Sequence, residues 1–138
     1  MTPAELIAQD TGRIRVKDSR AEIDKHASIP HISVTNFARA LRWHPQGLES
    51  WSLSDWYTAL AGECGELGNV VKKLNRVRDG LVGNKETTDQ LLGQLRDEAA
   101  DVFIYLDLFA RRAGFDLETA IRNKFNATSE KNGFPERL

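Results

Sequence analysis

The sequence predicts an all-α fold, and three observations support this prediction. Apolar residues recur with helical spacing in several segments, beginning with Val34, Phe37, Ala38 and Leu41 at positions i, i+3, i+4 and i+7 of one helix face. Turn signals such as Asp79-Gly80 separate these segments. No strand-rich region competes with the helical pattern. We therefore expect a bundle of about four helices.

The first two helices have clear sequence limits. The pattern that begins near Val34 stops at His44-Pro45, because the residue before a proline disfavours the helical conformation. Ser52 and Asp55 then resemble a capping box with a shorter acid than usual. This pair predicts a second helix from about Leu53 to Arg76 or Arg78, followed by a polar loop over residues 79–87.

Two further helices complete the predicted fold. The third is expected from Thr88 or Asp89 to Arg112 or Ala113, where Gly114 supplies a stop signal. Asp116 is a suitable N-cap for a fourth helix from Leu117 to about Lys131. Asn132-Gly133 and Pro135 would end it.

The chain divides into an arm and a domain. Residues 1–33 are polar and mixed in pattern, with a strand-like alternation at Arg13–Lys17 that has no obvious partner. We expect this arm to order only against the domain or a partner subunit. Residues 34–138 form the predicted all-α domain.

Composition excludes several classes of protein. The chain has 138 residues, 41% hydrophobic and 28% charged, which suits one soluble domain. No apolar run approaches the ~20 residues of a membrane span, and no secretion signal is evident at the N-terminus. Cys64 is the only cysteine, so a reducing cytoplasm is expected. The net charge of −1 argues against nucleic acid as a partner.

The third helix indicates self-association. From Ala99 to Ala110 its apolar residues extend around most of the circumference, which is typical of a helix buried on several sides. Two long and two shorter helices cannot bury it well alone. We expect a homodimer or homotetramer that completes the core.

Two pairs of acids dominate the candidate site. Glu63 and Glu66 form an E-x-x-E, and Glu98 and Asp101 form an E-x-x-D. Residues three apart share one helix face. Acids on a helix are usually a solvated surface, but small or apolar residues flank these four, and no basic residue stands at i+4 from any of them. The two pairs therefore predict a clustered cation site.

Oxygen ligands at this density suit Mg²⁺, with Mn²⁺ as a possible substitute. A di-iron site is disfavoured, because the Glu-x-x-His motif of such bundles is missing and His26, His31 and His44 all precede the first acid pair. Magnesium at such a site mainly serves phosphates.

Basic and polar residues for phosphate follow at suitable places. Lys73 lies two turns beyond Glu66 on nearly the same face, and Lys124 and Asn126 lie on the fourth helix. Each also has an ordinary explanation as a solvated surface residue. Glycines at 62, 65 and 68 indicate close approach of another helix or of a ligand, with helix packing the simpler explanation.

Several segments resemble the MazG-like all-α nucleoside triphosphate pyrophosphatases. Residues 59–67, Ala-Leu-Ala-Gly-Glu-Cys-Gly-Glu-Leu, look like the first motif helix of that family, and residues 97–106 look like the second. Asn123-Lys124-Phe125-Asn126 and the later Gly133-Phe134-Pro135 are similar to its C-terminal element. The resemblance covers roughly residues 34–135. The paired motif is fairly specific, whereas either half alone would be weak.

The resemblance implies Mg²⁺-dependent hydrolysis of a nucleoside triphosphate to the monophosphate and pyrophosphate, as in nucleotide-pool house-cleaning. It implies metal binding by Glu63, Glu66, Glu98 and Asp101, with Glu63 or Glu66 also catalytic. The implied substrate contacts are Lys73, Lys124, Asn126, Trp43, His44, Trp51 and Tyr105. The tryptophans are equally suited to be core or interface anchors. A non-catalytic helical nucleotide-binding or regulatory protein on the same fold is the alternative.

Overall fold

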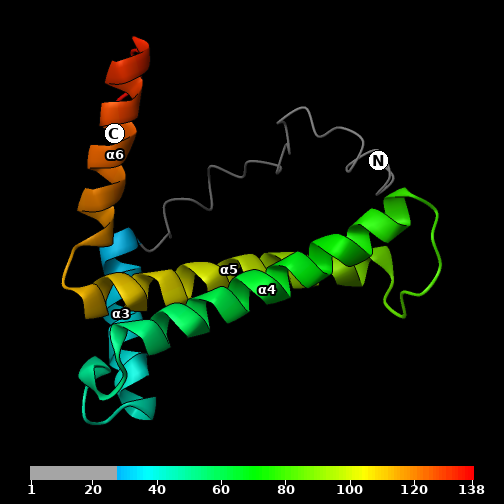
Figure 1. Cartoon of the computed structure of the whole chain (residues 1–138), viewed down its shortest axis with the longest axis horizontal. Helices are drawn as coiled ribbons and strands as arrows, with labels where there is room; N and C mark the ends of the chain where they lie inside the picture. The colour runs from blue at the N-terminus through cyan, green and yellow to red at the C-terminus, as the bar shows by residue number, and fades with distance from the viewer. Residues whose placement is uncertain (1–27) are drawn as a thin grey trace. The chain divides into compact units, whose positions relative to one another are not determined.

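The computed structural model describes residues 28–138, and its regular elements are all helical (Figure 1). They are α3 (Ile29–Trp43), a short 3-10 helix η1 (Leu48–Ser50), α4 (Leu53–Arg78), α5 (Thr88–Ala113) and α6 (Leu117–Asn132). The prediction of an all-α chain with four α-helices is thus confirmed for the described residues. The strand-like run Arg13–Lys17 lies outside them.

Local capping explains where α4 and α5 begin. The Ser52 backbone N–H donates to Asp55 Oδ2 at 2.8 Å, and the Asp55 N–H donates to Ser52 Oγ at 3.1 Å, which is the reciprocal pattern of a capping box. Thr87 and Gln90 form an equivalent pair before α5, with distances of 2.8 and 3.2 Å. The sequence analysis identified only the first pair, although Thr87 and Gln90 also fit the capping-box pattern.

The ends of α5 and α6 depend on glycine. Gly114 follows α5 with φ of 85°, and Gly133 follows α6 with φ of 68°. Both values lie in the left-handed region, where a side chain would clash with the backbone. Asp116 caps α6 by accepting from the Thr119 N–H at 2.8 Å.

Helix α3 begins earlier than the sequence analysis predicted. Its first residue is Ile29, five residues before Val34, and Ser28 is the N-cap, with Oγ accepting from the His31 N–H at 3.4 Å. Pro30 lies in the first turn, where its missing N–H costs nothing. The combination of Ser28 and Pro30 was the overlooked start signal.

The chain forms two compact units. The hairpin unit contains residues 60–103, in which α4 and α5 lie side by side with antiparallel directions (Figure 1). Its core is formed by buried Val70, Leu74 and Leu91. Partly buried Val77, Leu92 and Leu95 pack around them. The candidate site lies at one end of this unit, near its first residues on α4 and its last residues on α5.

The α3/α6 unit contains residues 28–59 and 104–138. Its core is formed by Ala40, Leu48, Trp56 and Leu108. Trp56 is 1% exposed, and its indole N–H donates to the Leu48 carbonyl at 2.9 Å. Burial of this indole with its polar atom satisfied makes Trp56 a core anchor.

No residue of the described chain packs closely against the three glycines of α4. A Cβ built at Gly62, Gly65 or Gly68 meets nothing within 4 Å among the described residues. Close approach of another helix or of a ligand to these glycines therefore stays a prediction, because no helix among residues 28–138 supplies it. The three glycines face open space. Any group that packs closely against them would have to come from outside residues 28–138.

None of the helices described here combines the length and the hydropathy needed to cross a bilayer.

Candidate metal centre

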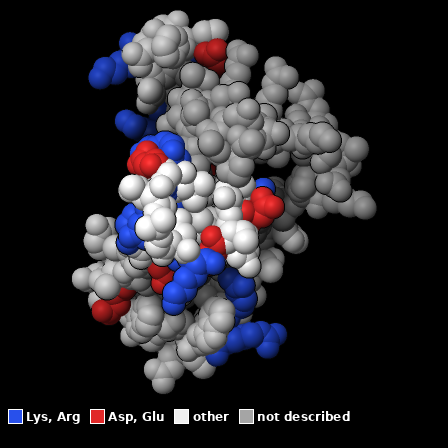
Figure 2. Space-filling view, turned by 90° about the vertical axis from the view of Figure 1, so that its right-hand side faces the viewer, with Lys and Arg blue, Asp and Glu red and all other residues white. Residues whose placement is uncertain are grey.

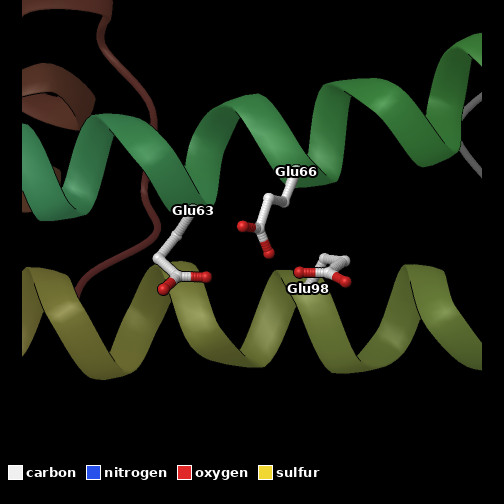
Figure 3. A group of neighbouring side chains, drawn as sticks. All are labelled: Glu63, Glu66 and Glu98. Atoms are coloured by element: carbon white, nitrogen blue, oxygen red, sulfur yellow. The ribbon is translucent and has the colours of Figure 1, made fainter.

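Three glutamates meet between α4 and α5 in the hairpin unit. Glu63 and Glu66 project from α4 toward α5, and Glu98 projects from α5 toward α4 (Figure 3). One carboxylate oxygen of each lies within 4.8 Å of the others. The structure thus brings together three of the four predicted acids. Asp101 is not a member of this group.

The arrangement follows from the packing stripe of each helix. On α4 the positions 63, 66, 70 and 74 lie along one face, and the last two are the buried Val70 and Leu74. On α5 the buried Leu91 and the partly buried Leu95 are followed by Glu98 with helical spacing. The glutamates therefore occupy positions at which the helical repeat would place apolar core residues.

The pKa values of two of these acids reflect crowding. Burial raises the pKa of Glu63 above its ordinary value, and the charges of Glu66, Asp101 and Glu98 raise it further. Burial is also the largest cause of a raised pKa for Glu98. The charges of Glu66 and Asp101, and a side-chain hydrogen bond with Glu66, raise this pKa further. Asp101 is thus close enough to act on both groups electrostatically.

No basic side chain of residues 28–138 neutralises the group. The ion pairs between described residues join Lys73 with Glu86, Arg78 with Asp79, and Arg122 with Glu118. Glu98 Oε2 is buried and has no hydrogen-bond partner. A buried carboxylate oxygen without a partner costs free energy, so this atom favours a bound cation.

The donor set fits a hard divalent cation. Magnesium binds oxygen at about 2.0–2.1 Å, so opposite ligands of one ion are separated by about 4.2 Å. Carboxylate oxygens that all lie within 4.8 Å of one another can surround one such ion after small side-chain adjustments. The group contains neither histidine nor cysteine, which disfavours zinc and di-iron chemistry. Exposed Cys64 lies between the two α4 glutamates in sequence but is not part of the group.

Lys73 is in the same unit but is engaged elsewhere. Its ammonium forms an ion pair with Glu86 from the loop that precedes α5. In addition, Asn84 Nδ2 donates to the Lys73 carbonyl at 2.8 Å. The loop therefore contacts both the backbone and the side chain of this predicted phosphate contact.

The other six candidate substrate contacts belong to the α3/α6 unit. His44 and Trp51 join Trp56 in an aromatic cluster with ring centroids 4.7–5.0 Å apart. Trp43 is 69% exposed, and the guanidinium of Arg39 lies 5.4 Å from its ring centroid. Exposed aromatic rings with a cation above them are suited to stacking on a planar ligand.

The remaining three candidates have different environments. Tyr105 packs against the core of the α3/α6 unit. Lys124 is exposed on α6. The Asn126 side chain is bound locally, since its Oδ1 accepts from the Leu138 N–H at 2.8 Å and its Nδ2 donates to the Leu138 carbonyl at 3.3 Å. The Asn126 side chain thus contacts the backbone of Leu138.

The sequence analysis missed Asn84 and Glu86. Both were assigned only to a polar loop, and their contacts with Lys73 span 11 and 13 residues. No helical periodicity relates residues on a loop to residues on the helix before it. The polar character of residues 79–87 was the sole available signal, and it does not identify partners.

Comparison with known proteins gives no assignment. No family model matches the sequence, and neither the curated proteins nor the solved structures contain a significant match.

Proposed function

We propose that the chain is a Mg²⁺-dependent nucleoside triphosphate pyrophosphatase of the MazG-like all-α type. One observation carries the proposal. Glu63, Glu66 and Glu98 meet between two helices without a basic counterion among the described residues, and the buried Oε2 atom of Glu98 has no hydrogen-bond partner. This group lies on the two segments that resemble the family's metal motifs.

In this proposal Glu63, Glu66 and Glu98 bind the cation, and Asp101 adds negative charge beside them. When bound, Mg²⁺ would neutralise phosphate oxygens and orient the polyphosphate. Glu63 or Glu66 orients the attacking water and accepts its proton. Water adds to the α-phosphorus, the α–β anhydride bond breaks, and pyrophosphate leaves.

The proposed substrate contacts extend this scheme. Lys73, Lys124 and Asn126 would bind phosphate or sugar, and Trp43, His44, Trp51 and Tyr105 would bind the base. The exposed ring of Trp43 and the aromatic cluster of His44 and Trp51 support stacking. We also propose a cytoplasmic homodimer or homotetramer, in which the open glycine face of α4 is available to a second copy.

Pyrophosphate release from a panel of ribo- and deoxynucleoside triphosphates tests the proposal. The purified full chain with Mg²⁺ should release pyrophosphate from at least one of them. Glu66→Gln should abolish release, whereas Glu130→Gln, which removes an exposed acid from α6, should not. If the wild type turns over none of the nucleotides, the enzyme proposal fails and the non-catalytic alternative takes its place.

A further inference from the structure

Lys73 lies on nearly the same face of α4 as Glu66. It follows Glu66 by seven residues, which is about 10.5 Å along the helix axis and about 20° from the same face. Long helical side chains lean toward the N-terminus of their helix, and for Lys73 this is the direction of Glu66. The flexible four-carbon stem of lysine adds further reach.

The Lys73 ammonium nevertheless has an anionic partner already. Glu86 forms an ion pair with it, and the two side chains are 32% and 23% exposed. The hydrogen bond from Lys73 is the largest cause of a lowered pKa for the Glu86 carboxyl. Glu86 therefore stays ionised, takes one of the three N–H donors of Lys73 and offsets the positive charge that would attract a phosphate oxygen.

The contact differs from an incidental surface pair. Asn84, two residues before Glu86, donates to the Lys73 carbonyl, and Arg76 Nη1 lies 3.5 Å from Asn84 Oδ1. The loop is thus fixed to the helix beside Lys73. Figure 2 shows Lys and Arg side chains interspersed with Asp and Glu side chains on one face of the molecule, and these contacts of the loop distinguish the Lys73–Glu86 pair from such scattered surface charges.

We propose that Glu86 is a resident counterion of Lys73 that a metal-bound polyphosphate displaces. This inference rests on the proposed function, because it requires a polyphosphate at the three glutamates. Glu86 acts through Lys73 and touches no reacting atom, so it is a positioning residue. When no ligand is bound, its carboxylate pairs with Lys73. Because an incoming phosphate must displace this carboxylate, Glu86 lowers the affinity of the site for phosphate.

Variants of the two residues test the inference. Glu86→Gln should lower KM for the turned-over nucleotide by about two- to fivefold, the factor that corresponds to an exposed ion pair, and should leave kcat unchanged. Lys73→Gln should raise KM by about tenfold or more. In the double variant Lys73→Gln/Glu86→Gln, the gain from the Glu86 substitution should disappear. Asp89→Asn, which removes an exposed acid from the first turn of α5, is the matched control and should not tighten binding.

A purely structural role for Glu86 gives a different result. Unchanged or weaker binding in Glu86→Gln, or a gain that persists without Lys73, would overturn the inference. Calorimetric binding of inorganic triphosphate in excess Mg²⁺ gives a readout that needs no turnover. If no nucleotide is hydrolysed but triphosphate binding follows the predicted pattern, only the proposed hydrolysis fails. If hydrolysis occurs and the pattern is missing, only the role of Glu86 fails.

Discussion

Asn36 on α3 donates a hydrogen bond to Asp107 on α5, from Nδ2 to Oδ2 at 2.9 Å, and both side chains are almost fully buried. The same nitrogen donates to the Ile104 carbonyl at 2.9 Å. Ser33 adds a parallel contact by accepting from Arg111 Nη2 at 2.9 Å. A polar seam therefore joins α3 to α5 inside the α3/α6 unit.

Removal of the donor should destabilise this seam. Asn36→Ala leaves the buried Asp107 oxygen without its partner, and we expect the free energy of unfolding to fall by about 1–3 kcal/mol. Chemical denaturation monitored by circular dichroism measures the change. Asn123→Ala, at an exposed position of α6, is the control and should have little effect. Equal stabilities of the two variants would show that the hydrogen bond contributes nothing.

The hairpin core should depend strongly on Leu91. This side chain is fully buried in a cluster with Val70 and Leu74, and Leu91→Ala removes its apolar contacts and leaves a cavity. We expect a loss of about 2–5 kcal/mol in the free energy of unfolding. Leu81→Ala, at a position 62% exposed, should change stability much less. A loss at Leu91 no larger than the loss at Leu81 would contradict the assigned core.

The raised pKa of Glu98 predicts a pH-dependent stability difference. A carboxyl whose pKa is raised by folding binds more protons in the folded state, so its contribution to stability decreases as pH rises from the unfolded value near 4.5 through the raised value. Without metal, Glu98→Gln should be more stable than the wild type at pH 7. The difference should shrink as pH falls below about 4.5, where both states are protonated.

Thermal unfolding of the two proteins between pH 4 and pH 8, with a chelator present, measures this difference. Glu130→Gln again serves as the control for loss of one surface charge. A Glu98→Gln variant that is less stable than the wild type at pH 7 would mean that the carboxylates do not repel each other in the folded state. Added Mg²⁺ should stabilise the wild type more than Glu98→Gln, because the ion binds only the folded site.

Direct metal binding separates the enzyme from a metal-independent binding protein. We expect calorimetric titration with Mg²⁺ or Mn²⁺ to show a site of millimolar or tighter affinity. Glu98→Gln should weaken it by about tenfold or more, since even loss of a residue behind a metal ligand costs about 10–100-fold. Absence of any metal site in the wild type would favour the non-catalytic alternative, and iron in the purified protein would favour a di-iron protein.

The features that the sequence predicted well are local ones. The capping box of Ser52 and Asp55, the stop at Gly114 and the cap at Asp116 each depend on residues at most a few positions apart. The meeting of Glu63 and Glu66 with Glu98 followed from helical spacing and a short connection between two helices. Such relationships are encoded in the repeat of the helix itself.

The features that the sequence did not predict are contacts across long separations. Asn36 and Asp107 are 71 residues apart, and their bond depends on how α3 packs on α5. The pairing of Lys73 with Glu86 depends on the path of a loop. The packing register of α4 on α5 likewise selects Glu98 rather than Asp101 for the group of three. A single sequence contains no signal for such pairings.

The products of nucleotide hydrolysis test the central claim most directly. Phosphorus NMR of the purified wild-type protein with Mg²⁺ and a turned-over triphosphate distinguishes cleavage at the α–β bond from cleavage at the β–γ bond. The account predicts nucleoside monophosphate and pyrophosphate in equal amounts, and neither product with Glu66→Gln. Nucleoside diphosphate and orthophosphate as the products, or undiminished cleavage by Glu66→Gln, would contradict it.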